Sequence, residues 1–212
     1  KAIALKPKSA EPYRLRGQAR QARSYLDAAI EDYNRALEYA PDDPAILLAR
    51  GDAQSAKGDL QAAIKDLQKV VSLDPKHAEG YIALGDAQQR AKQWKEAVAS
   101  YSEAIRIAPS AYDPYLRRGM AYRLLGDAQQ AIVSLDEAIR LRPRDAADAY
   151  YERARAGVSL LKTGRWAVMS ALEFYHAILP SIRRNNYDVF TRRAGTSKLR
   201  KLGLIVQAWR QV

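Results

Sequence analysis

Residue types that carry out catalysis or bind metals are scarce in this chain of 212 residues. It contains no cysteine and two histidines, His77 and His176. Without cysteine, the chain cannot form disulfides, thiolate nucleophiles or Cys-ligated zinc sites. Neither histidine has a serine or carboxylate partner at the spacing of a catalytic motif, so we expect both to be surface or packing residues rather than general bases. The sequence therefore predicts no cofactor and no metal site.

The elements that position the remaining side chains follow a period of 34 residues. Within each copy, apolar residues recur at helical spacing in two runs. Small residues let the two helices approach closely, and a proline ends the second helix because it has no N–H to continue the hydrogen bonding. Prolines keep the period from Pro7 to Pro143, as do two small columns and one bulky column: Gly17, Gly51, Gly85, Gly119; Ala29, Ala63, Ala97, Ala131; and Tyr33, Leu67, Tyr101, Leu135.

This period and these columns resemble the tetratricopeptide repeat (TPR) family across about residues 1–145. The resemblance implies an all-α fold, a right-handed superhelix (solenoid) of antiparallel helix pairs with a concave inner face. The predicted parts are the tail of a truncated preceding repeat at 1–9, four repeats at 10–43, 44–77, 78–111 and 112–145, and a helical C-terminal module at 146–212.

If the family's register holds, one face of each repeat's first helix lines the concave surface. This face mixes apolar and charged side chains, which suits an extended peptide or a helix laid in a groove. The side chains that some family members use to clamp a C-terminal carboxylate are missing, because the matching column reads Gln18, Asp52, Asp86 and Met120. The predicted partner-binding residues are Arg14, Gln18, Gln21, Leu48, Asp52, Ser55, Ile82, Asp86, Gln89, Leu116, Met120 and Arg123, and Glu11, Glu79 and Asp113 share the face.

Basic residues concentrate in the last third of the chain. Residues 146–212 hold twelve Lys and Arg against four Asp and Glu, and residues 183–210 hold eight against Asp188 alone. We interpret this segment as a solvated basic face, with contact to an anionic membrane surface as the alternative. Nucleic acid is not the expected partner, because no nucleic-acid-binding motif accompanies the segment. No apolar run reaches 18 residues, so we expect a cytoplasmic protein, peripheral to a membrane at most.

The C-terminal sequence carries a second pattern. Tyr150-Tyr-Glu-Arg-Ala-Arg-Ala-Gly157 and Asn186-Tyr-Asp-Val-Phe-Thr-Arg-Arg-Ala194 occur in this order. These residues, and about 150–212 as a whole, resemble the end of phytoene and squalene synthases. The resemblance implies all-α enzymes that join two prenyl diphosphates with magnesium held by two Asp-rich motifs. It also implies that Tyr175 matches a pocket tyrosine and that Arg192 matches an arginine that helps hold diphosphate.

The Asp-rich motifs themselves are absent from the sequence given. No Asp-x-x-x-Asp occurs, and the nearest patterns are Asp27 with Glu31 and Asp148 with Glu152. Without these carboxylates the magnesium cluster has no ligands. We therefore interpret the chain as a scaffold that binds a protein or peptide and does not catalyse a reaction by itself. The alternative is a fragment of a fusion between repeats and an isoprenoid synthase, which recruits partners to carotenoid or hopanoid synthesis. A third possibility is that the last helices only resemble the synthase and cap the solenoid through Trp166, Met169, Phe174 and Ile178.

Overall fold

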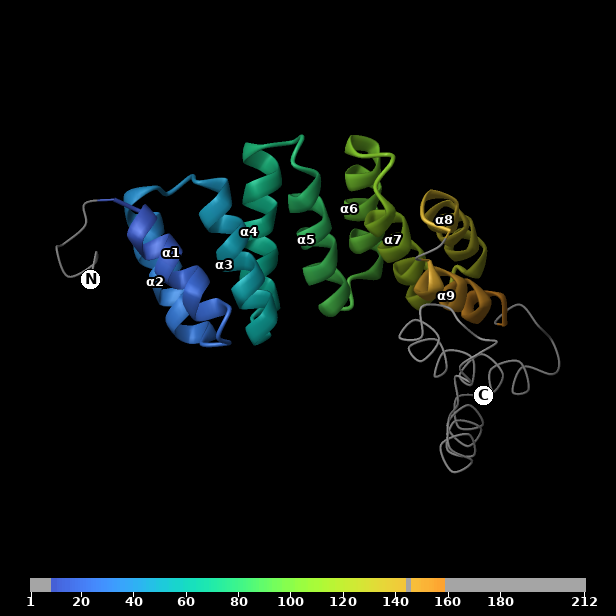
Figure 1. Cartoon of the computed structure of the whole chain (residues 1–212), viewed down its shortest axis with the longest axis horizontal. Helices are drawn as coiled ribbons and strands as arrows, with labels where there is room; N and C mark the ends of the chain where they lie inside the picture. The colour runs from blue at the N-terminus through green and yellow to red at the C-terminus, as the bar shows by residue number, and fades with distance from the viewer. Residues whose placement is uncertain (1–8, 144–145, 159–212) are drawn as a thin grey trace, which may run out of the picture. The chain divides into compact units, whose positions relative to one another are not determined.

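The computed structural model describes residues 9–143 and 146–158, and every element in these ranges is an α-helix. The described helices pack as sequential antiparallel pairs, which confirms the predicted all-α class (Figure 1). Their bounds are α1 (Glu11–Gln21), α2 (Leu26–Tyr39), α3 (Pro44–Lys57), α4 (Leu60–Leu73), α5 (Ala78–Arg90), α6 (Trp94–Ile107), α7 (Tyr112–Leu125), α8 (Ala128–Leu141) and α9 (Ala147–Val158).

The chain divides into two compact units, Lys1–Pro114 and Tyr115–Val212, with the boundary in the first turn of α7. In unit 1, α1 packs on α2, α3 on α4 and α5 on α6, and each pair also contacts the next. In unit 2, α8 packs on α9. The predicted repeat bounds and the C-terminal module remain predictions, and most of that module lies outside the described residues. No described helix is long and apolar enough to cross a membrane.

Glycines in the first helix of each pair set how closely the second helix packs. An added Cβ on Gly85 would lie 2.5 Å from Cε1 of Tyr101, and one on Gly119 would lie 2.5 Å from Cγ of Leu135. Tyr101 and Leu135 are fully buried, so neither side chain has space to move away. The glycine column therefore makes room for the bulky column of the following helix, inside unit 1 and inside unit 2.

Among the described residues, the turn inside each helix pair from α1–α2 to α7–α8 has a left-handed residue at the same position. Gly58 has φ 104° and Gly126 has φ 90°, whereas Ser24 and Lys92 both have φ 61°. Added Cβ atoms on Gly58 and Gly126 would meet nothing within 4 Å, so glycine is favoured there by backbone conformation and not by crowding. Ser24 and Lys92 adopt the same geometry at a steric cost.

Ion pairs join the two helices of the first two pairs. Arg16 donates to Asp32 at 2.8 and 2.5 Å, and Arg20 lies 2.9 Å from the same carboxylate, of which 1% is exposed. Arg50 donates to Asp66 at 2.6 and 2.7 Å, one period further along the chain. These arginines are thus held by carboxylates of the second helices.

Candidate binding groove

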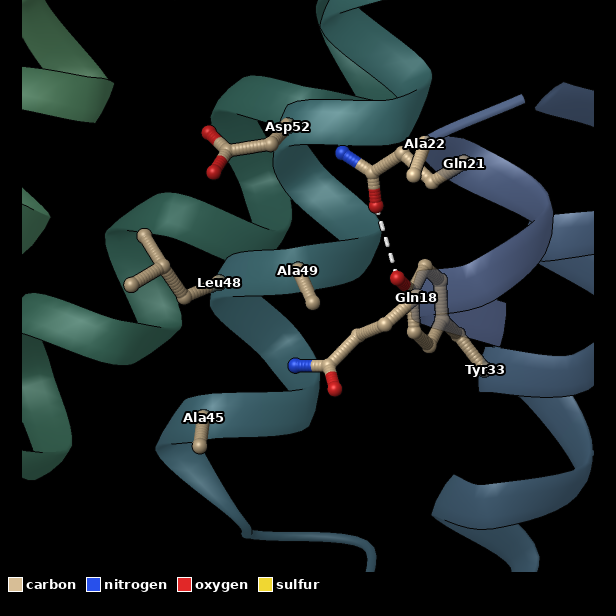
Figure 2. Close-up of a pocket in the computed structure, with 8 residues that line it drawn as sticks. All are labelled: Gln18, Gln21, Ala22, Tyr33, Ala45, Leu48, Ala49 and Asp52. Carbon is tan, nitrogen blue, oxygen red and sulfur yellow. Dashed lines mark hydrogen bonds between the residues drawn. The ribbon is translucent and has the colours of Figure 1, made fainter. Parts of the chain in front are cut away.

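A groove of about 590 Å³ lies between α1 and α3 in unit 1 (Figure 2). Helix periodicity explains its lining, because Ala45, Leu48, Ala49 and Asp52 fall on one face of α3. The residues that line it are Gln18, Gln21 and Ala22 from α1 and its C-cap, Tyr33 from α2, and Ala45, Leu48, Ala49 and Asp52 from α3. Of the predicted binding residues on α1 and α3, Gln18, Gln21, Leu48 and Asp52 therefore line the groove, whereas Arg14 and Ser55 do not.

Tyr33 fixes the polar wall of the groove. Its hydroxyl donates a hydrogen bond of 2.6 Å to Oε1 of Gln21, drawn as the dashed line in Figure 2. Burial, together with the negative charge of Asp52, raises the pKa of Tyr33 to about 12, so the phenol stays protonated and remains a donor. Because Oε1 of Gln21 accepts this bond, the NH2 group of Gln21 is the end that can donate to a bound backbone carbonyl.

Asp52 is the charged residue among the groove's lining side chains. Water reaches its carboxylate from the open side, yet the surrounding helices displace enough water to raise the pKa of Asp52 to about 6. The negative charges of Glu79 and Asp86 on α5 raise this pKa further. The carboxylates of α3 and α5 therefore repel one another electrostatically.

Helix α5 extends this surface beyond the groove. Glu79, Ile82, Asp86 and Gln89 recur at helical spacing, so they lie on one face of α5. The hydroxyl of Tyr101 donates to Oδ1 of Asp86 at 2.7 Å, which orients that carboxylate. The face is acidic, with one partly buried aliphatic side chain, Ile82, between its two carboxylates.

Three predicted binding residues are bound by other side chains of the fold. Ser55 is 8% exposed, and its hydroxyl accepts a hydrogen bond of 2.9 Å from Nη1 of Arg90. We expected Ser55 to face a partner, but its side chain is buried in the fold. In unit 2, Nε of Arg123 donates to Oε2 of Glu152 at 2.6 Å, and Glu152 is 8% exposed. The Arg14 guanidinium is bound by Glu11 at 2.7 Å.

The other predicted residues fall in different places. Leu116 and Met120 are half-buried on α7, in unit 2. Tyr175, Arg192, His176 and the basic segment 183–210 lie outside the described residues. His77 is the N-cap residue of α5, and its buried Nδ1 has no hydrogen-bond partner in the part of the chain that the structure describes. Within that part, no three His, Cys, Asp or Glu side chains group as metal ligands would.

The sequence pattern did not reveal Tyr33 as a groove residue. It belongs to the bulky column, which we interpreted as packing alone. The available signal was Gly17 on α1, because a missing side chain there lets the ring pass close to the backbone and brings its hydroxyl to the groove. Ala22, Ala45 and Ala49 were also missed, since small residues carry no recognition signal.

Family models place this chain in a known class of repeat proteins. Models described as tetratricopeptide repeat match residues 14–78, 48–112 and 112–145. These matches together span more than half of the chain. The chain therefore belongs to the tetratricopeptide repeat family, as its columns predicted.

Solved structures share the fold. MamA is 28% identical with a TM-score of 0.62, over 66% of this chain and 81% of that chain. The thermophilic TPR protein TTC0263 of Thermus thermophilus is 21% identical with a TM-score of 0.62, over 95% of this chain and all of that chain (100%). The first TPR of Spaghetti (RPAP3), bound to the HSP90 peptide SRMEEVD, is 22% identical with a TM-score of 0.53, over 55% of this chain and 92% of that chain.

A squalene/phytoene synthase model matches residues 134–200. The 15-cis-phytoene synthase of Synechocystis sp. is 42% identical over 66 residues, which are 31% of this chain and 20% of the relative. Phytoene synthase 3 of Zea mays is 41% identical over 64 residues, 30% of this chain and 15% of the relative. The chain thus spans a fifth or less of these two curated relatives. The match begins in α8, earlier than the 150 we expected, and overlaps the last repeat.

Proposed function

We propose that this chain is a binding module that holds a protein or peptide on the face formed by α1, α3 and α5, without catalysing a reaction by itself. The groove between α1 and α3 carries the proposal, because it combines an apolar floor with fixed polar groups. The solved TPR of Spaghetti, which is bound to a peptide, gives a precedent in the same fold. A cytoplasmic location stays a prediction, with contact between the basic segment and an anionic membrane as the alternative to a solvated face.

Site-directed photo-crosslinking tests this role. A photoreactive residue replaces Gln18, which is exposed at the groove, and in a matched protein it replaces Glu31, which is exposed on α2 and does not line the groove. In a lysate of the native host, we expect a discrete cross-linked protein at Gln18 and none at Glu31. Equal labelling at both positions, or no labelling at either, would contradict binding in the groove.

A second candidate function rests on the 134–200 match to the squalene/phytoene synthase model. In this version the chain is a piece of a fusion in which the repeats recruit partners to isoprenoid synthesis. The sequence given contains no Asp-x-x-x-Asp. Glu152, which forms one of the two nearest patterns with Asp148, is bound by Arg123. We therefore expect no squalene or phytoene from the chain with magnesium and farnesyl or geranylgeranyl diphosphate. A metal-dependent product above the protein-free control would instead favour the enzyme.

A further inference from the structure

Two carboxylates near the groove lack a counter-charge. Asp52 on α3 and Glu79 on α5 have no hydrogen bond or ion pair with any described side chain. Helices α3 and α5 contact one another directly, and both carboxylates are exposed on them. The negative charge of Glu79 accordingly raises the pKa of Asp52. Two carboxylates that repel one another and remain open to solvent form a favourable place for a cation from outside the chain.

The cationic side chains of the same helices are already used elsewhere. Arg16 and Arg20 of α1 are bound by Asp32, and Arg50 of α3 is bound by Asp66. Arg14 is held by Glu11 at 2.7 Å. On α5, Arg90 donates to the hydroxyl of Ser55 at 2.9 Å. The described arginines of α1, α3 and α5 thus have partners of their own, and neither Asp52 nor Glu79 is among these partners.

Apolar side chains lie next to these carboxylates. Leu48 is one helical turn before Asp52, and Ile82 is one turn after Glu79. Leu48 is partly buried against the core clusters of unit 1, so it presents a fixed edge to the groove. On the opposite wall of the groove, the side-chain amides of Gln18 and Gln21 can form hydrogen bonds with the backbone of a bound peptide.

From this arrangement we infer that the face of α1, α3 and α5 selects a peptide segment that carries arginine or lysine next to apolar side chains. The inference rests on the proposed function and names the chemistry of its partner. A guanidinium between Asp52 and Glu79 would supply the missing counter-charge, while the neighbouring apolar side chains cover Leu48 and Ile82. Acidic segments would be repelled from this face. The expected partner therefore differs from SRMEEVD, the acidic peptide bound to the TPR of Spaghetti.

The groups that face Asp52 support the same chemistry. They are Gln18 and Gln21 from α1, Tyr33 from α2, and Glu79 and Asp86 from α5, with Arg14 of α1 acting on Tyr33 from further away. The pKa of Asp52 is raised to about 6, so its negative charge at neutral pH is less favourable in the free protein than that of an ordinary aspartate. A bound cation removes this cost, and its binding should release a proton near pH 6.

The test uses the full chain and three labelled synthetic peptides that differ only in their charged positions. Each alternates leucine and alanine with a variable residue, which is arginine, glutamine or glutamate. Fluorescence anisotropy should show the arginine peptide binding most tightly, and this binding should weaken as salt is added. Asp52→Asn should weaken it about tenfold, and Glu79→Gln by a similar factor, in line with the coupling between close charge pairs.

The matched control is Glu31→Gln, which removes one negative charge from the exposed surface of α2 away from the groove. It should leave the affinity for the arginine peptide unchanged. Circular dichroism verifies that all three variants are folded. Equal affinity for the three peptides, or a preference for the glutamate peptide, would overturn the inference. So would an affinity for the arginine peptide that does not change in Asp52→Asn. None of these results would remove a cross-link at Gln18, so a failure of the inference is distinguishable from a failure of the proposed function.

Discussion

The ring of Tyr33 occupies the space that a side chain at Gly17 would take. A Cβ at Gly17 would lie 2.7 Å from Cε1 and 2.9 Å from Cδ1 of Tyr33, closer than such carbon atoms approach in proteins. Because Tyr33 is fully buried, the ring cannot rotate away. The same contact places the hydroxyl of Tyr33 beside Gln21, 2.6 Å from its Oε1. The packing of the first helix pair and the polar wall of the groove therefore depend on one close approach.

Gly17→Ala should destabilise the protein although alanine is the better helix former. The added methyl group overpacks the crossing of α1 and α2, at a cost of about 1–3 kcal/mol. Gly157→Ala is the matched control, since a Cβ there meets nothing within 4 Å in α9. It should stabilise by about 0.5–1 kcal/mol. Urea titrations followed by circular dichroism measure both, and equal effects of the two substitutions would contradict the packing.

Lys92→Gly should stabilise the protein. Lys92 has φ 61°, in the left-handed region, where Gly58 and Gly126 stand at the equivalent turns. The left-handed conformation costs a residue with a Cβ about 1–2 kcal/mol. Part of this gain is offset by the greater freedom of glycine in the unfolded chain, which leaves a net gain of about 0.5–1 kcal/mol.

Gly58→Ala is the reciprocal substitution at the equivalent turn. Its Cβ would meet no neighbour, so any loss of stability comes from the backbone conformation alone. We expect a loss of about 1 kcal/mol in the same urea titration. If Lys92→Gly lowered the urea midpoint, the strain assigned to these turns would not exist.

The helical fold was predictable from the sequence because it depends on spacing. Glycine, alanine and bulky columns at one period identify which residues pack together, as Gly85 and Tyr101 do. The site was less predictable because solvent exposure depends on individual partners. Ser55 has the spacing of a groove residue, yet Arg90 reaches its hydroxyl from a helix two elements further along the chain. No periodicity reveals such a contact.

Arg123→Ala should destabilise unit 2 through the carboxylate that it leaves behind. Glu152 has a side chain that is 11% exposed, and Arg123 lies 2.6 Å from it. A charge that is buried and then loses its partner costs about 3–5 kcal/mol, and the partial exposure of this pair reduces the expected loss to about 2–3 kcal/mol. Thermal unfolding followed by circular dichroism should show this loss without any partner present.

Arg140→Ala is the matched control for Arg123→Ala. Arg140 makes the same type of contact with Glu137 at 2.7 Å, but the two side chains are 67% and 42% exposed. Exposed pairs contribute little, so we expect a change below about 0.5 kcal/mol. Similar losses for both substitutions would show that the burial of Glu152 does not matter. Arg123 would then be free to serve as the binding residue that the sequence suggested.

Asp52→Asn should change stability in a manner that depends on pH. Burial, with the charges of Glu79 and Asp86, raises the pKa of Asp52 from 3.8 to about 6 in the folded protein. A raised pKa means that the folded state holds the proton more tightly than the unfolded state. The stability from this group is therefore fully present below pH 4 and is lost as the pH rises through 6. Asparagine has no proton to lose, so the variant should match the parent in acid and be more stable at pH 7.5.

The expected difference in unfolding free energy between Asp52→Asn and the parent at pH 7.5 is small, because solvent screens a carboxylate that is more than a third exposed. We expect no more than about 1 kcal/mol after this discount. Melting temperatures of both proteins, measured at intervals from pH 4 to pH 8, give the profile directly. Glu31→Gln, on the exposed surface of α2, reports the effect of removing a carboxylate outside the groove. A gap for Asp52→Asn that is constant across the range, or largest in acid, would show that the acidic face does not raise the cost of this charge.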